Sequence, residues 1–131
     1  MLSRVEKFEV ALKQTECDAV LVTNLKNIYY LTGFSGTEAT VFISKTRRIF
    51  LTDSRYTLIA KGVVKGFDII ETRDALGEIA KIIGDDKLEK IGFDDQVSYA
   101  YFEMLKRVFA AYKLIAMSSF IENLRMIKDA E

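Results

Sequence analysis

The chain has 131 residues, of which 50% are hydrophobic and 29% are charged, a size and balance typical of one globular domain. The 19 Lys and Arg residues are matched by 19 Asp and Glu residues, and a net charge of zero argues against a nucleic-acid partner. Histidine is absent, which excludes Ser–His and Cys–His nucleophile pairs and every metal site built on imidazole.

The N-terminus and the single cysteine predict a cytoplasmic chain. Met1 to Arg4 lead into a charged amphipathic segment rather than into the apolar core of a signal peptide. No apolar stretch approaches the roughly 18 residues that a membrane span requires, so we expect no membrane partner. Cys17 has no disulfide partner, and its neighbours Glu16 and Asp18 disfavour the thiolate, so we expect it to be a packing residue.

Periodicity and capping residues predict alternating helices and strands. Ser3 and Glu6 form a potential capping box at the first helix, as do Ser119 and Glu122 at the last, and Gly33 is placed to end the second helix. The expected helices cover residues 3–16 and 24–33 and begin near residues 53, 74, 98 and 119, and the expected strands cover residues 18–23, 39–44, 47–52, 67–71, 90–93 and 112–117.

The spacing of these elements predicts an α/β fold. Only Lys45 and Thr46 separate the second strand from the third, which favours an antiparallel hairpin. The other strands alternate with amphipathic helices, as in parallel crossover units. Together these features predict a central mixed sheet with helices on both faces. Asp53 or Ser54 is expected to cap the helix that follows the hairpin.

Three carboxylates follow predicted strands, at the sheet edge where α/β folds bind ligands. Asp53 follows one strand, and Asp94 and Asp95 follow another. They could hold a magnesium ion for phosphoryl transfer, because that cation takes oxygen ligands. They could instead be a helix cap and a solvated turn, which we favour because such caps are common and metal sites are rare.

A basic cluster marks the hairpin turn. Lys45, Arg47 and Arg48 lie within four positions of one another, and we expect them to be solvated there.

Three stretches resemble one known family. Residues 27–39 contain an Asn-Ile-Tyr-Tyr-Leu-Thr-Gly-Phe run followed by a glycine loop, residues 50–56 contain a strand-end Asp before Arg and Tyr, and residues 122–131 contain Leu-Arg and Lys-Asp-Ala-Glu runs. In this order they resemble the creatinase/prolidase family, and more closely the N-terminal domain of bacterial Xaa-Pro dipeptidases and Xaa-Pro aminopeptidases. The resemblance covers essentially the whole chain.

The resemblance implies a three-layer α/β/α domain of ribonuclease H-like type over residues 1–118. It implies that residues 119–131 begin the linker and first helix of a second, metallopeptidase domain with the pita-bread fold, where we expect Leu124 and Ile127 to pack. In such enzymes that second domain uses two aspartates, one histidine and two glutamates to bind two divalent ions, usually manganese, cobalt or zinc. None of these ligands maps onto this chain, so we expect no catalytic residue, no metal and no peptidase activity in these residues alone.

The resemblance also implies an accessory role. N-terminal domains of this family take part in homodimer formation and wall the cleft that admits short peptides with proline second. By analogy the cleft-facing candidates are Phe34, Ser35, Gly36, Thr37 and Glu38, where Gly36 permits the turn and Glu38 could meet a substrate ammonium. We expect structural roles for Asp53, Arg55 and Tyr56. A stand-alone binding module remains the alternative to a domain with a catalytic partner.

Overall fold

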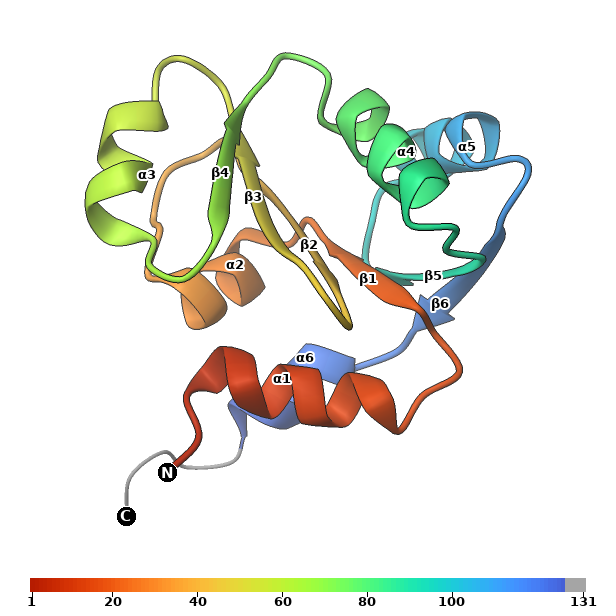
Figure 1. Ribbon diagram of the computed structural model, residues 1–131, viewed down its shortest axis with the longest axis horizontal. Helices are drawn as coiled ribbons and strands as arrows, with labels where there is room; N and C mark the ends of the chain where they lie inside the picture. Colours follow the sequence, from red (N-terminus) through yellow and green to blue (C-terminus); the bar gives the residue numbers. More distant parts are fainter. Residues whose placement is uncertain (127–131) are drawn as a thin grey trace.

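A mixed sheet with strand order β4-β3-β2-β1-β5-β6 runs through the middle of the protein (Figure 1). The computed structural model describes residues 1–126, and none of their helices is long and apolar enough to cross a bilayer. The strands are β1 (Ala19–Val22), β2 (Thr40–Ser44), β3 (Arg48–Thr52), β4 (Asp68–Glu71), β5 (Lys90–Asp94) and β6 (Lys113–Met117). The helices are α1 (Arg4–Lys13), α2 (Leu25–Thr32), α3 (Thr57–Val63), α4 (Ala75–Asp85), α5 (Tyr99–Val108) and α6 (Phe120–Arg125).

One strand, β2, runs against all the others. It pairs antiparallel with β1 and with β3, which confirms the predicted hairpin. The pairs β3–β4, β1–β5 and β5–β6 are parallel. The carboxyl ends of β1, β3, β4, β5 and β6 therefore share one edge of the sheet with the start of β2. We call this the carboxyl edge.

Alternating side chains of the strands form two cores, one on each face of the sheet. Val20 and Val22 point to the face covered by α1, α2, α3 and α6, whereas Ala19 and Leu21 point to the face covered by α4 and α5 (Figure 1). Each fully buried aliphatic side chain contributes about 1.5–3 kcal/mol. This arrangement confirms the expected three-layer α/β/α fold.

Several predicted helix ends are confirmed by their hydrogen bonds. Ser3 and Glu6 form both halves of a capping box, and the side chains of Asn24, Asp74 and Ser98 accept bonds from backbone amides of α2, α4 and α5. Gly33 ends α2 in the left-handed region, with φ of 80°.

Two predicted caps are wrong. Asp53 and Ser54 do not cap α3, because they lie in a turn and the helix begins after Tyr56 without a side-chain cap. Ser119 precedes α6 with a φ of 59° and makes no side-chain capping bond. Glu122, its predicted partner, instead accepts a hydrogen bond from the Asn27 side chain at 2.9 Å.

That bond belongs to a buried polar group that joins α6 to the sheet, which we call the Asn27 cluster. Nδ2 of Asn27 donates to Glu122 and, at 3.1 Å, to Asp94 at the end of β5. Asn27 is 1% exposed, and its Oδ1 has no hydrogen-bond partner among residues 1–126. The cluster fixes α6 against α2 and β5.

Apolar contacts also hold α6 on this domain. Ile121 is 4% exposed, and Phe120 contacts Phe8 of α1 edge to face at 5.3 Å. Leu124 packs against the same core, whereas Ile127 lies outside the described residues. The described part of the segment expected to open the next domain therefore packs on this one, while the boundary at residue 118 stays a prediction.

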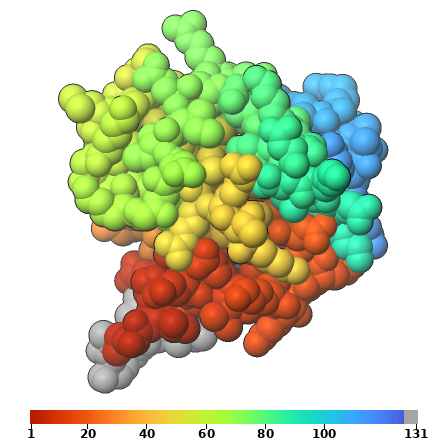
Figure 2. All heavy atoms as spheres, viewed as in Figure 1, coloured from red at the N-terminus to blue at the C-terminus, as the bar shows by residue number. Residues whose placement is uncertain are grey.

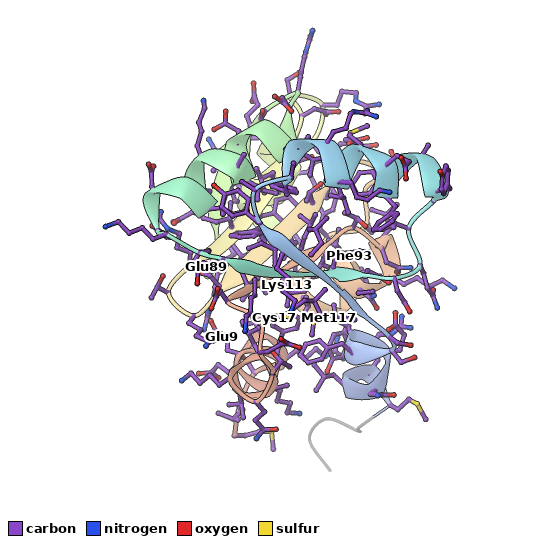
Figure 3. All side chains as sticks on the ribbon, turned by 90° about the vertical axis from the view of Figure 1, so that its right-hand side faces the viewer. Glu9, Cys17, Glu89, Phe93, Lys113 and Met117 are labelled. Carbon is purple, nitrogen blue, oxygen red and sulfur yellow. The ribbon has the colours of Figure 1, made fainter. Side chains whose placement is uncertain are left out.

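Cys17 lies in the core, as predicted for a packing residue. It is 1% exposed, and its Sγ lies 3.9 Å from Sδ of Met117, between the β5–β6 strands and α1 (Figure 3). Burial is the main cause that raises the pKa of this thiol. Gly92 of β5 leaves room for the two sulfur atoms, since a Cβ at this position would contact both side chains.

The two arginines of the hairpin are not simply solvated, which corrects the sequence-based expectation. Arg47 forms two hydrogen bonds to Asp86 at the end of α4, and Arg48 forms two to Glu9 of α1. Neighbouring residues of a strand point to opposite faces, so this pair connects both helical layers to one hairpin. The hairpin lies between α1 and the α4 segment in the space-filling view (Figure 2).

Candidate functional site

The structure brings the cleft-facing candidates and the residues predicted to be structural together at the carboxyl edge. The loop 34–38 precedes β2, and Asp53, Arg55 and Tyr56 follow β3, its hairpin partner. The Thr37 hydroxyl forms a hydrogen bond of 2.7 Å with the Tyr56 hydroxyl. The Thr52 hydroxyl donates to the backbone carbonyl of Glu38. The loop is therefore fastened to the end of β3 at two points.

Phe34 anchors the loop from inside the core. It is 2% exposed and makes edge contacts with Phe50 at 5.0 Å and Tyr56 at 5.6 Å. Gly36 lies against the rings of Phe34 and Tyr56, and a Cβ at this position would come within 2.9 Å of Tyr56. Among the five loop candidates, Ser35, Thr37 and Glu38 are exposed, whereas the side chain of Phe34 belongs to the core. That the exposed members face a substrate stays a prediction.

Asp53 and Arg55 form an ion pair at the mouth of this site. Nη2 of Arg55 donates to Oδ2 of Asp53 at 2.7 Å, and the guanidinium lies 5.2 Å from the centre of the Tyr56 ring. This hydrogen bond lowers the pKa of Asp53, and nearby Arg73 lowers it further. The same hydrogen bond raises the pKa of Arg55, and the negative charge of Glu38 raises it further. The pair orders the turn that leads into α3.

The hydrogen bond from Thr37 lowers the pKa of Tyr56, because it stabilises the phenolate. Replacing Thr37 with valine removes this donor, so we expect the pKa of Tyr56 to rise toward its ordinary value of about 10. A ¹³Cζ-tyrosine NMR titration measures this shift, with Thr46→Val in the hairpin turn as the control. An unchanged Tyr56 titration in Thr37→Val would show that the bridge does not form.

An open cleft of about 450 Å³ adjoins the loop at the ends of β3 and β4. Its walls include Glu38, Asp53 and Arg55 from the predicted groups, and Arg73 from the connection between β4 and α4. Sequence reasoning missed Arg73. The only signal in the sequence for Arg73 is its place two residues after a strand. Its approach to Asp53 depends on the parallel pairing of β3 with β4.

The carboxylates of the magnesium hypothesis are not brought together. Asp53 follows β3 and Asp94 ends β5, and β2 and β1 lie between them, so they are separated by three strand spacings or about 14 Å. Asp94 is buried in the Asn27 cluster and also accepts a bond from the amide of Gln96. Within residues 1–126 no three His, Cys, Asp or Glu side chains gather where they could hold a metal ion.

Comparison with known proteins gives one consistent result. The family model for the Creatinase/Prolidase N-terminal domain matches residues 4–127. An uncharacterized peptidase of Bacillus subtilis, YqhT, is 32% identical over 130 residues, which is 98% of this chain but 37% of the length of that protein. The chain thus spans little more than a third of its curated relative.

Solved structures agree. An Xaa-Pro aminopeptidase structure from Streptococcus thermophilus is 58% identical with a TM-score of 0.91, and the match covers 94% of this chain and 96% of that one. An Xaa-Pro dipeptidase from Bacillus anthracis is 30% identical with a TM-score of 0.87, and the match covers 96% of this chain and 36% of that one. Because the family match takes in nearly every residue, this chain belongs to the creatinase/prolidase N-terminal domain family.

Proposed function

We propose that the chain is the non-catalytic N-terminal domain of a metal-dependent Xaa-Pro peptidase, where it walls the active-site cleft and contributes to a homodimer. One observation carries the proposal: the chain matches 36% of an Xaa-Pro dipeptidase and 37% of a peptidase, in each case with nearly its whole length. The single buried cysteine suits a reducing compartment, and we place the protein in the cytoplasm.

The catalytic metals of such an enzyme belong outside this chain. The chain has no histidine, and the described residues offer no cluster of acidic side chains for a metal ion. We propose that two divalent ions, of manganese, cobalt or zinc, are held entirely by the second domain. This chain would contribute the shape and the charge of the entrance to the active-site cleft.

The exposed loop at 35–38 is the part proposed to wall the cleft. Its position is fixed by Phe34 below and by the Thr37–Tyr56 hydrogen bond at the side, so it presents Glu38 on a rigid support. Glu38 has no ion pair within residues 1–126 and is free to meet the ammonium of a short peptide. A fixed wall of this kind would admit short peptides with proline second and exclude longer ones.

Helix α3 offers a surface for the proposed homodimer. Leu58, Ile59 and Val63 are 84%, 56% and 43% exposed, so this short helix presents apolar side chains to solvent. The helix lies beside β4, at one edge of the sheet (Figure 1). Apolar groups gathered on one surface favour association with a second protein surface.

A chimera tests the proposal. This chain replaces the N-terminal domain of the Bacillus anthracis Xaa-Pro dipeptidase, with which it shares 30% identity. We expect metal-dependent hydrolysis of an Xaa-Pro dipeptide, with a KM that rises about tenfold in Glu38→Gln while kcat changes little, because a charge-assisted contact is lost. Glu89→Gln, at the amino end of β5, is the matched control.

The same chimera reports on assembly. Leu58→Glu should shift it from dimer to monomer in sedimentation velocity, because a charge would be buried at the interface. An active chimera whose KM is the same in Glu38→Gln and Glu89→Gln would contradict the proposed cleft wall. A chimera that remains dimeric with Leu58→Glu would contradict the role of α3.

A further inference from the structure

A small cavity adjoins the Asn27 cluster at the carboxyl edge. It has a volume of about 10 Å³, and its walls include Asn27, Asp94 and Glu122 together with apolar side chains of β1, β6 and α6. A space of this size has room for about one particle as large as a water molecule.

The cavity lies between two strands whose helices leave in opposite directions. β1 and β5 are parallel neighbours, but α2, which follows β1, covers one face of the sheet, and α5, which follows β5, covers the other (Figure 1). Crevices at the carboxyl ends of such strands are where open α/β sheets bind ligands.

One oxygen atom of the cluster has no partner. Asn27 is 1% exposed, and its Nδ2 donates to both carboxylates, but its buried Oδ1 accepts no hydrogen bond from residues 1–126. Oδ1 is bonded to the same carbon as Nδ2, so it belongs to the same polar group. Because buried polar groups are normally paired, this oxygen indicates a ligand that donates to it or is coordinated by it.

The cluster also has an excess of negative charge. Asp94 and Glu122 accept hydrogen bonds from the same nitrogen, so two carboxylates face each other across one amide. Asp94 is 7% exposed, and neither carboxylate forms an ion pair with a Lys or Arg of residues 1–126. Carboxylates removed from water require an opposite charge or a proton.

We propose that the Asn27 cluster binds one dehydrated sodium ion, through Oδ1 of Asn27 and oxygens of Asp94 and Glu122. The ion would coordinate the unpartnered carbonyl oxygen and balance the carboxylates, whereas a water molecule would do only the first. Only two of the ligands are acidic, and the third is an amide carbonyl. Divalent ions fit less well, because calcium takes about six to eight oxygen ligands and magnesium keeps several waters, for which the cavity has no room.

Bound sodium would fasten α6 to the domain, because the three ligands come from α2, β5 and α6. All of them belong to this chain, so the inference does not rest on the proposed function. A site half filled at about 20 mM sodium would raise the melting temperature by about 5 °C in 0.2 M sodium chloride, relative to choline chloride of the same concentration.

NMR titration of the ¹⁵N-labelled 131-residue chain with sodium chloride tests the inference. The side-chain amide signals of Asn27 report on the cluster directly, and those of the exposed Gln14 are the internal control. We expect the Asn27 signals to shift with sodium and to saturate, with a midpoint of about 20 mM. Choline chloride at the same ionic strength should leave them unchanged, because this cation is too large for the cavity.

Substitutions assign the ligands. Glu122→Gln and Asp94→Asn each remove one charge but keep an oxygen that can accept the bond from Nδ2. Glu122→Gln also supplies an N–H that can donate to Oδ1, so we expect this variant to fold without sodium. Both variants should lose the sodium-dependent shift and the gain in melting temperature. Asp95→Asn, at the exposed neighbouring position, is the matched control and should keep both.

Three results would overturn the inference. The first is an equal effect of sodium and choline on the Asn27 signals, including no effect of either. The second is a sodium dependence that persists in Glu122→Gln. The third is a response of the Asn27 signals to pH without a response to sodium, which would assign a shared proton to the cluster in place of the ion.

Discussion

Replacing Gly36 with alanine should destabilise the domain by about 1–3 kcal/mol, the usual cost of forcing extra atoms into a packed site. The added Cβ would lie 2.8 Å from Cε2 of Phe34 and 2.9 Å from Cε1 of Tyr56. Neither ring can bend away, because Phe34 is buried against Phe50 and the Tyr56 hydroxyl is bonded to Thr37. The loop 34–38 must therefore move off the end of β3.

Urea denaturation of the unmodified chain and of Gly36→Ala measures this change in the free energy of unfolding. Gly62→Ala is the matched control, because a Cβ at Gly62 has no atom within 4 Å and alanine favours the helical conformation of α3. We expect the control to be neutral or to stabilise the domain by up to about 1 kcal/mol. Equal stability of the two variants would show that the loop is loosely held.

Ending the chain after Ser118 should cost about 3–5 kcal/mol of stability, because it removes α6. Ile121 leaves an apolar gap, Phe8 loses its aromatic contact, and the buried Nδ2 of Asn27 loses its bond to Glu122. A chain that ends after Met126 keeps all three contacts and is the control.

Thermal unfolding of these two truncated chains decides where the domain ends. A large loss in the shorter chain with a small change in the longer one would assign α6 to this domain. If the shorter chain unfolds at the same temperature as the complete one, the boundary at residue 118 holds, and α6 belongs with the segment that follows.

Features set by neighbouring residues could be predicted from the sequence. The caps at Ser3, Asn24, Asp74 and Ser98 and the helix stop at Gly33 depend on bonds within three or four positions, and all five are found. The hairpin and the alternation of strands and helices give the mixed sheet for the same reason. The order of the strands is settled by pairing between distant segments.

Features that depend on distant pairing escaped prediction. Glu122 looked like half of a capping box, but its side chain bonds to Asn27, which is 95 positions away. Arg47 and Arg48 each reach a carboxylate 39 positions away. At the site, the loop 34–38 was predicted to face a cleft and residues 53–56 were given structural roles. The cleft itself was not predicted, because it requires Arg73 to be brought near Asp53 by the β3–β4 pairing.

Because Cys17 is buried, the reactivity of its thiol reports how often the sheet separates from the α1–α6 layer. The chain has one thiol, and that thiol is shielded by the contact between the sheet and the α1–α6 layer, so a thiol reagent can label it only when these elements separate. Labelling rates under native conditions would therefore follow the frequency of that separation without any added dye or engineered cysteine. A ligand that tightens α6 would slow the reaction, and each molecule would be modified at a single position.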